Sequence, residues 1–128
     1  MKSLSALSGL SGLFGATLKI QPTSVATAAA FREVVLGSPI PVIVNVWSST
    51  CAPCKQQAPI LVDLATTRQG KIRVVEIATT AEPALLAELG IQATPTTLIY
   101  DKGAEVGRVT GFRPKSWFDE MIKVELTR

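Results

Sequence analysis

The chain has 128 residues, of which 47% are hydrophobic, so it is long enough for one domain with a sizeable apolar core. Its 13 Lys and Arg residues exceed its 10 Asp and Glu residues, but the charges are scattered, so the sequence predicts no nucleic-acid partner. No stretch reaches the roughly 18 consecutive apolar residues that a membrane span needs.

The first half of the chain predicts two strands that alternate with two helices. Residues 41–47 form a nearly continuous β-branched run, which is typical of a strand covered on both faces. In chain order, the expected elements are a strand over residues 18–21 closed by Pro22, an alanine-rich helix capped by Thr23 or Ser24 and ending near Leu36, the buried strand over residues 41–47, and a helix over residues 54–67.

The second half predicts a strand, a short helix, a hairpin and a final amphipathic helix. The turn residues Asp101, Lys102 and Gly103 separate the two arms of the hairpin. The expected elements are a strand over residues 72–78, a helix from Pro83 to Gly90, hairpin strands over residues 96–100 and 106–110, and a helix over residues 115–126. This order predicts an α/β domain whose central mixed sheet carries helices on both faces.

Cys51 and Cys54 are the two cysteines of the chain, and they lie between the buried strand and the helix that follows it. If this helix begins near Cys51, its unpaired N–H groups and its dipole stabilise a Cys51 thiolate, which makes Cys51 the attacking sulfur. Cys54, one turn further on, can then attack the mixed disulfide at Cys51 and release the partner. Pro53 suits the first turn, because its missing N–H is not needed there.

Two other interpretations of the cysteine pair stay open. Zinc would need two further ligands. Because the chain has no histidine and no third cysteine, these ligands would have to be carboxylates or come from a second chain. A structural disulfide that closes so short a loop would constrain the unfolded chain little. A four-cysteine iron–sulfur cluster and a Cys–His nucleophile are excluded within one chain by composition. We expect no cofactor or metal other than the redox-active disulfide itself.

From about Leu18 to the C-terminus the chain resembles the thioredoxin family. The resemblance is carried by several colinear motifs, which are Trp47, Cys51-Ala52-Pro53-Cys54-Lys55, Ala58-Pro59, Thr94-Pro95-Thr96, Gly103 and Gly111. It implies that Pro95 is a cis proline facing the sulfurs and that Thr94 offers backbone hydrogen bonds to a bound substrate strand. An ordinary trans proline in a loop is the alternative.

The resemblance also implies a surface that docks substrates around the sulfurs. Its residues would be Trp47, Thr50, Ala52, Pro53, Thr94, Pro95, Thr110, Gly111 and Phe112. The alternatives are that Trp47 only packs in the core and that Phe112 is an isolated exposed aromatic.

Three positions depart from the family pattern. Many thioredoxins carry a tryptophan directly before the first cysteine, where this chain has Thr50. The buried aspartate that helps to deprotonate the second cysteine is replaced by Asn45, which cannot act as a base. The lysine that often pairs with that aspartate corresponds to Glu76. Glu76, or water, is therefore a candidate to take the proton of Cys54, unless Glu76 points to solvent from a strand edge.

Asn45 and Thr94-Pro95-Thr96-Thr97 are also similar to the branch of the superfamily that resembles TlpA and ResA, which are membrane-tethered reductants outside the cytoplasm. The chain lacks the central insert of that branch. Its assignment to a branch stays open.

Residues 1–17 are expected to be an uncleaved extension outside the domain. They superficially resemble a secretory signal, but serine and glycine dilute the apolar stretch and Lys19 interrupts it. Leucines recur every third residue, which could give residues 1–18 an apolar face toward a protein or a membrane surface. Glycines weaken any helix there, and disorder until binding is the alternative.

We therefore expect a thioredoxin fold over residues 18–128, with about five strands and four helices. The expected function is disulfide exchange with protein substrates, as a monomeric cytoplasmic reductant that an upstream dithiol reductase recharges. An extracytoplasmic location is the alternative. A thioredoxin-like accessory subunit without exchange activity is the competing function, because of the extension and the changes at Asn45 and Glu76.

Overall fold

The computed structural model describes residues 18–126 of the chain. The predicted extension over residues 1–17, with its leucine-rich face, lies outside these residues. Within residues 18–126, no helix combines the length and the apolar character that crossing a membrane requires.

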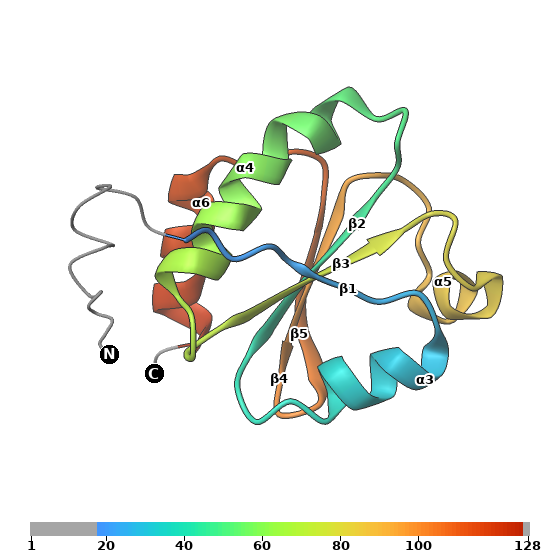
Figure 1. Ribbon diagram of the computed structural model, residues 1–128, viewed down its shortest axis with the longest axis horizontal. Coiled ribbons are helices and arrows are strands. Elements are labelled where there is room, and N and C mark those ends of the chain that lie inside the picture. Colours follow the sequence, from blue (N-terminus) through green and yellow to red (C-terminus); the bar gives the residue numbers. More distant parts are fainter. Residues whose placement is uncertain (1–17, 127–128) are drawn as a thin grey trace, which may run out of the picture.

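The centre of the domain is a five-stranded mixed sheet (Figure 1), as the sequence predicts. Its strands lie in the order β1-β3-β2-β4-β5, in which β1, β3 and β2 are parallel and β4 and β5 run antiparallel to their neighbours. The strands are β1 (Thr23–Ser24), β2 (Val42–Trp47), β3 (Arg73–Ala78), β4 (Thr96–Asp101) and β5 (Ala104–Thr110).

Helices cover both faces of this sheet, with α4 and α6 on one face and α3 and α5 on the other (Figure 1). The α3 helix runs directly into η1, and α6 runs directly into η2; both of these continuations have π-helical hydrogen bonding. The helices are α3 (Ala28–Phe31), η1 (Arg32–Leu36), α4 (Ala52–Thr67), α5 (Pro83–Leu89), α6 (Lys115–Met121) and η2 (Ile122–Leu126).

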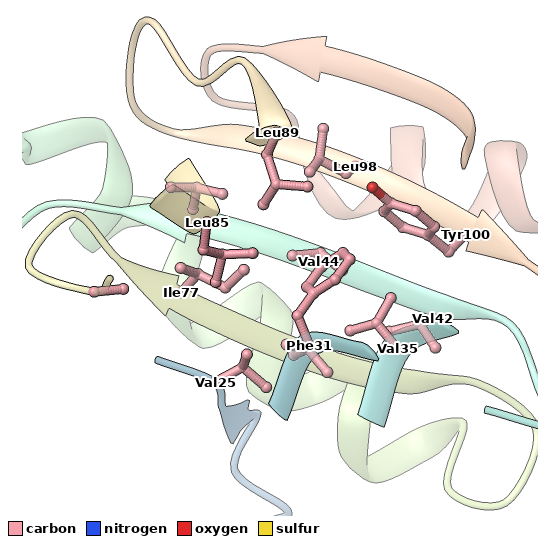
Figure 2. Packing of buried hydrophobic residues seen from close by; sticks show 13 residues of the cluster. Val25, Phe31, Val35, Val42, Val44, Ile77, Leu85, Leu89, Leu98 and Tyr100 are labelled. Carbon is pink, nitrogen blue, oxygen red and sulfur yellow. The ribbon is translucent and has the colours of Figure 1, made fainter. Parts of the chain in front are cut away.

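The β2 strand is buried on both sides, which explains its almost uninterrupted apolar sequence. Val42, Val44 and Val46 point to the core under α3 and α5, which Figure 2 shows from close by. Ile43 points the other way and packs under α4 and α6. Asn45 shares the face of Ile43, because side chains two residues apart in a strand lie on one side. A polar amide is therefore inserted into the sheet face that α4 covers.

The N-terminal elements begin later than the sequence predicts. The first strand is β1 (Thr23–Ser24), after Pro22, and residues 18–21 precede it. The helix starts at Ala28, and its cap is Thr27, whose hydroxyl accepts a hydrogen bond of 3.1 Å from the Ala30 N–H. Pairing of Thr23 and Ser24 with Val75 and Glu76 explains the difference, because residues held in a strand cannot also cap a helix.

Strand register brings three loops to the same end of the sheet. Val46, near the end of β2, pairs with Thr96, the first residue of β4, and Thr96 in turn pairs with Thr110, the last residue of β5. The segment that follows β2 carries the cysteines. It therefore lies at the same end of the sheet as the Thr94–Pro95 segment before β4 and the Gly111–Arg113 segment after β5.

Candidate active site

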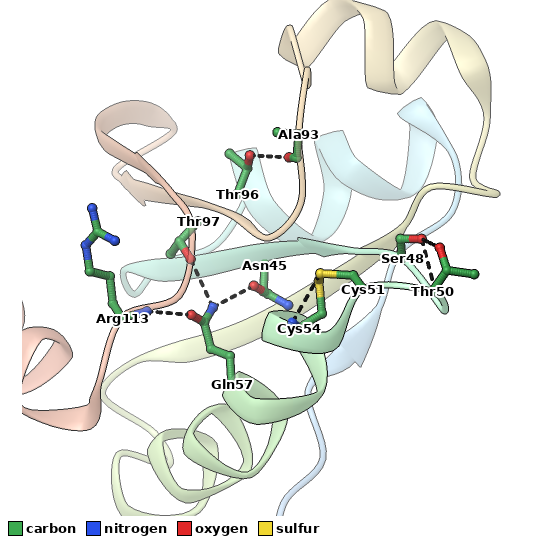
Figure 3. Close-up of a disulfide and its surroundings, with 10 residues drawn as sticks. All are labelled: Asn45, Ser48, Thr50, Cys51, Cys54, Gln57, Ala93, Thr96, Thr97 and Arg113. Atoms are coloured by element: carbon green, nitrogen blue, oxygen red, sulfur yellow. Dashed lines mark hydrogen bonds between the residues drawn. A yellow bond between two sulfur atoms is a disulfide. The ribbon is translucent and has the colours of Figure 1, made fainter.

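A disulfide joins Cys51 to Cys54 across the first turn of α4, and their Cα atoms lie 5.2 Å apart. Cys51 is the N-cap of this helix, and its Sγ atom accepts a hydrogen bond of 3.2 Å from the backbone N–H of Cys54 (Figure 3). Pro53 lies in the first turn, where no hydrogen bond needs its nitrogen. The positive end of the helix dipole and this N–H donor both favour negative charge on Cys51.

The two sulfur-bearing residues differ in exposure. Cys51 is half-buried, whereas only 5% of Cys54 is exposed. Ala52 and Pro53 between them are exposed. Cys51 is therefore the more accessible of the two cysteines.

The Thr94–Pro95 peptide is cis, as the family resemblance implies. Pro95 is buried, and its carbonyl oxygen accepts a hydrogen bond of 2.7 Å from the Gly111 N–H. Gly111 has a φ of 97°, a conformation that residues with a side chain rarely adopt. This bond fixes the Gly111–Arg113 segment against the proline.

The other predicted docking residues surround this edge with different exposures. Trp47 and Thr94 are half-buried, and Thr50 and Phe112 are exposed. Thr50 is tied back to the loop, since its backbone N–H donates to the Ser48 hydroxyl over 3.3 Å. Strand register thus brings these docking residues to the same end of the sheet as the cysteines.

A network of buried polar side chains lies behind the disulfide. Asn45, one of the positions at which the sequence departs from the family pattern, is one of its members. Gln57 is fully buried, and its Nε2 atom donates to Asn45 Oδ1 over 2.9 Å and to Thr97 Oγ1 over 3.4 Å. Its Oε1 atom accepts a hydrogen bond of 2.9 Å from the Arg113 backbone N–H (Figure 3). Gln57, on α4, therefore ties together β2, β4 and the segment after β5.

A signal for Gln57 was present in the sequence. Gln57, Leu61 and Leu64 recur at helical spacing and share the buried side of α4. Glutamine in such an apolar stripe is costly to bury unless its amide is hydrogen-bonded. A polar residue at this spacing could therefore have been interpreted as part of an internal network.

Glu76 lies next to Asn45 in the register of the parallel strands β3 and β2. Both residues line a cavity of about 290 Å³ that Cys54 and Trp47 also line. Because β3 lies between β1 and β2, Glu76 is not at a sheet edge. Burial raises the pKa of the Glu76 carboxyl above its ordinary value, since a charged carboxylate loses solvation there.

A disulfide at the start of a helix, between one half-buried and one buried cysteine, is typical of a thiol–disulfide oxidoreductase. Among residues 18–126, no group of three His, Cys, Asp or Glu side chains is arranged to hold a metal ion.

Comparison with known proteins gives the family. The Thioredoxin family model matches residues 22–124. Thioredoxin 1 of the cyanobacterium Nostoc sp. is 34% identical over 100 residues, which cover 78% of this chain and 94% of that protein. Thioredoxin of Pyropia yezoensis is 37% identical over 93 residues, covering 73% and 87%. The M-type chloroplastic thioredoxin of Pisum sativum is 32% identical over 104 residues, covering 81% and 60%.

The chain belongs to the thioredoxin family. It is a protein-disulfide oxidoreductase that exchanges disulfides as a reductant, and its Cys-X-X-Cys pair is Cys51 and Cys54. Members of the family act on protein disulfides and are reduced in turn by a reductase.

The raised pKa of Glu76 predicts a pH-dependent effect of Glu76→Gln on stability. Between the ordinary glutamate pKa of about 4.3 and the higher folded-state pKa, the folded protein holds a proton that the unfolded chain has lost. Ionisation of Glu76 therefore destabilises the fold as pH rises through this window, and the loss persists at neutral pH. We expect Glu76→Gln to increase the free energy of unfolding at pH 7, with the gain disappearing below about pH 4.

Urea unfolding at a series of pH values measures this difference. Glu120→Gln makes the same change of charge at an exposed site on α6 and corrects for net charge. A gain that is the same at all pH values, or a loss of stability at pH 7, would contradict the assignment.

Proposed function

We propose that Cys51 is the attacking cysteine and Cys54 the resolving cysteine. The Cys51 thiolate attacks one sulfur of a substrate disulfide, which forms a mixed disulfide and releases the first substrate thiolate. The Cys54 thiolate then attacks the Cys51 sulfur, which forms the Cys51–Cys54 disulfide and releases the second. The substrate gains two electrons, the enzyme loses two, and the released thiolates take protons from water.

The observation that carries this assignment is the asymmetry of the pair. Cys51 caps α4, is half-buried and receives an N–H hydrogen bond, so it combines access with stabilised negative charge. Cys54, three residues further along the first turn of α4, is almost fully buried. A buried thiol reacts poorly with an incoming protein but lies within reach of a disulfide formed at Cys51.

The substrate groove in this proposal lies along the edge where Pro95, Gly111 and the cysteines meet. Thr94 precedes the cis proline and is half-buried, and in this proposal its backbone pairs with an extended substrate segment. Exposed Thr50, Ala52 and Phe112 would contact the same segment from either side.

Glu76 is the proposed acceptor of the Cys54 proton. It lines the same cavity as Cys54, and its raised pKa makes it a better base than an ordinary surface glutamate. Asn45, at the position where the family pattern has an acid, cannot take this proton. Water within the cavity would complete the path from the thiol to the carboxylate.

Each turnover leaves the pair oxidised, so the proposed cycle needs an upstream dithiol reductase. The same reductant role favours the cytoplasm, where thiols are kept reduced, over an oxidising compartment.

Trapping of the mixed disulfide tests the order of the two cysteines. Cys54→Ser removes the resolving thiol, so we expect a stable adduct between Cys51 and a disulfide-containing protein such as insulin, detectable by mass spectrometry. Cys51→Ser should form no adduct with insulin and should reduce it with dithiothreitol no faster than dithiothreitol alone. A stable adduct at Cys54, or activity of Cys51→Ser equal to that of the unmodified protein, would reverse the assignment.

Glu76→Gln tests the proton acceptor separately from the attack. With an aromatic disulfide as substrate, the first coloured thiol reports attack by Cys51 and the second reports resolution by Cys54. We expect Glu76→Gln to leave the first phase unchanged and to slow the second by about 100-fold, the lower end of general-base contributions. Glu120→Gln is the matched control, and an unchanged second phase excludes Glu76 as the base.

A further inference from the structure

We infer that Gln57 is a positioning residue that fixes the direction of the Asn45 side-chain amide, so that an N–H of Asn45 faces the sulfur of Cys54. The inference rests on the proposed resolving role of Cys54. Its basis is the order of donors and acceptors along the buried chain of groups from Arg113 through Gln57 to Asn45.

The direction of the Gln57 amide is set by the protein backbone. The Arg113 backbone N–H can only donate, so the Gln57 atom that lies 2.9 Å from it must be the oxygen Oε1. The Gln57 amide nitrogen is then directed toward Asn45 and Thr97. Because Gln57 is fully buried, no bulk water can substitute for these partners if the amide turns over.

The same logic fixes the Asn45 amide one step further on. The Gln57 Nε2 atom can only donate, so the Asn45 atom 2.9 Å away must be the acceptor Oδ1. The Asn45 amide nitrogen is then left on the opposite side, and Figure 3 shows it turned toward Cys54. Asn45 and Cys54 also line the same cavity.

An N–H donor next to Cys54 favours the thiolate form of that cysteine. A hydrogen bond from a neutral N–H group to a charged acceptor favours the ionised form and lowers the pKa of the acceptor by about one unit. Asn45 therefore stabilises the Cys54 thiolate once its proton has left, whereas a carboxylate at the same position would oppose that charge. Gln57 acts through Asn45, because its own amide groups are used by Asn45, Thr97 and Arg113.

Two charged groups share the cavity with Cys54 and must stay constant in any test. Glu76 reaches it from β3, and Lys55 reaches it from α4. Both are retained in every variant below. Differences in the titration midpoint of Cys54 are therefore caused by changes to the Asn45 and Gln57 amides.

The experiment measures the titration of the Cys54 thiol in the full chain with Cys51→Ser, which leaves Cys54 as the single cysteine. Ultraviolet absorbance of the thiolate gives the midpoint. We expect Asn45→Leu to raise this midpoint by about one pH unit, which corresponds to loss of one hydrogen bond to a charged group. Gln57→Met should raise it as well, but should add nothing in a chain that already carries Asn45→Leu, because Gln57 acts through Asn45.

Thr97→Val is the matched control, since it removes the 3.4 Å bond from Gln57 in the same buried cluster but keeps the bond to Asn45. It should leave the midpoint unchanged. The inference is overturned if Gln57→Met leaves the midpoint unchanged, or if it shifts the midpoint by the same amount with and without Asn45→Leu.

A second measurement keeps Gln57 and Asn45 intact. In the Cys51→Ser protein, the NMR signals of the Asn45 side-chain amide should change with pH at the same midpoint as the Cys54 thiol. Asn45 amide signals that do not change over the Cys54 titration would contradict a hydrogen bond between Asn45 and Cys54. Neither readout depends on turnover, so failure of this inference and failure of the proposed function are distinguishable.

Discussion

Burial of β2 on both faces is the constraint on which the active site depends. Alternate valines of this strand fill the core under α3 and α5, while Ile43 fills the core under α4 and α6. The strand cannot shift its register without moving apolar side chains into the wrong core. Near its end Val46 pairs with Thr96, the residue after the cis proline, so the segment that carries Cys51 leaves the sheet at the end where Pro95 precedes β4.

Asn45 is the one polar residue of β2, and its burial has a structural consequence. A buried amide must find partners, and it finds them in Gln57 on the helix that carries the cysteines. Gln57 also accepts from the segment after β5, which Gly111 links to Pro95. One network of neutral hydrogen bonds thus holds the cysteine helix, the central strand and the proline edge in a single arrangement, without a buried charge.

Much of the fold could be predicted from local patterns, because they agree with the global structure. The apolar run of β2, the turn around Lys102 and the helical spacing of Phe118 and Ile122 each predict the observed element. The position of β1 and the first residue of α3 could not be predicted, because the pairing of Thr23 with Val75 depends on a distant strand. For the same reason the role of Gln57 was missed, since its partners lie 12 to 56 residues away in the sequence.

The midpoint potential of the Cys51–Cys54 pair tests most directly whether this protein is a reductant. Full-length protein would be equilibrated with glutathione buffers of known potential, and the oxidised fraction measured by thiol alkylation and mass spectrometry. A reductant of protein disulfides should have a midpoint below the cytosolic glutathione poise of about −220 to −260 mV. A midpoint near the value of about −120 mV that is typical of a strong disulfide donor would contradict that function.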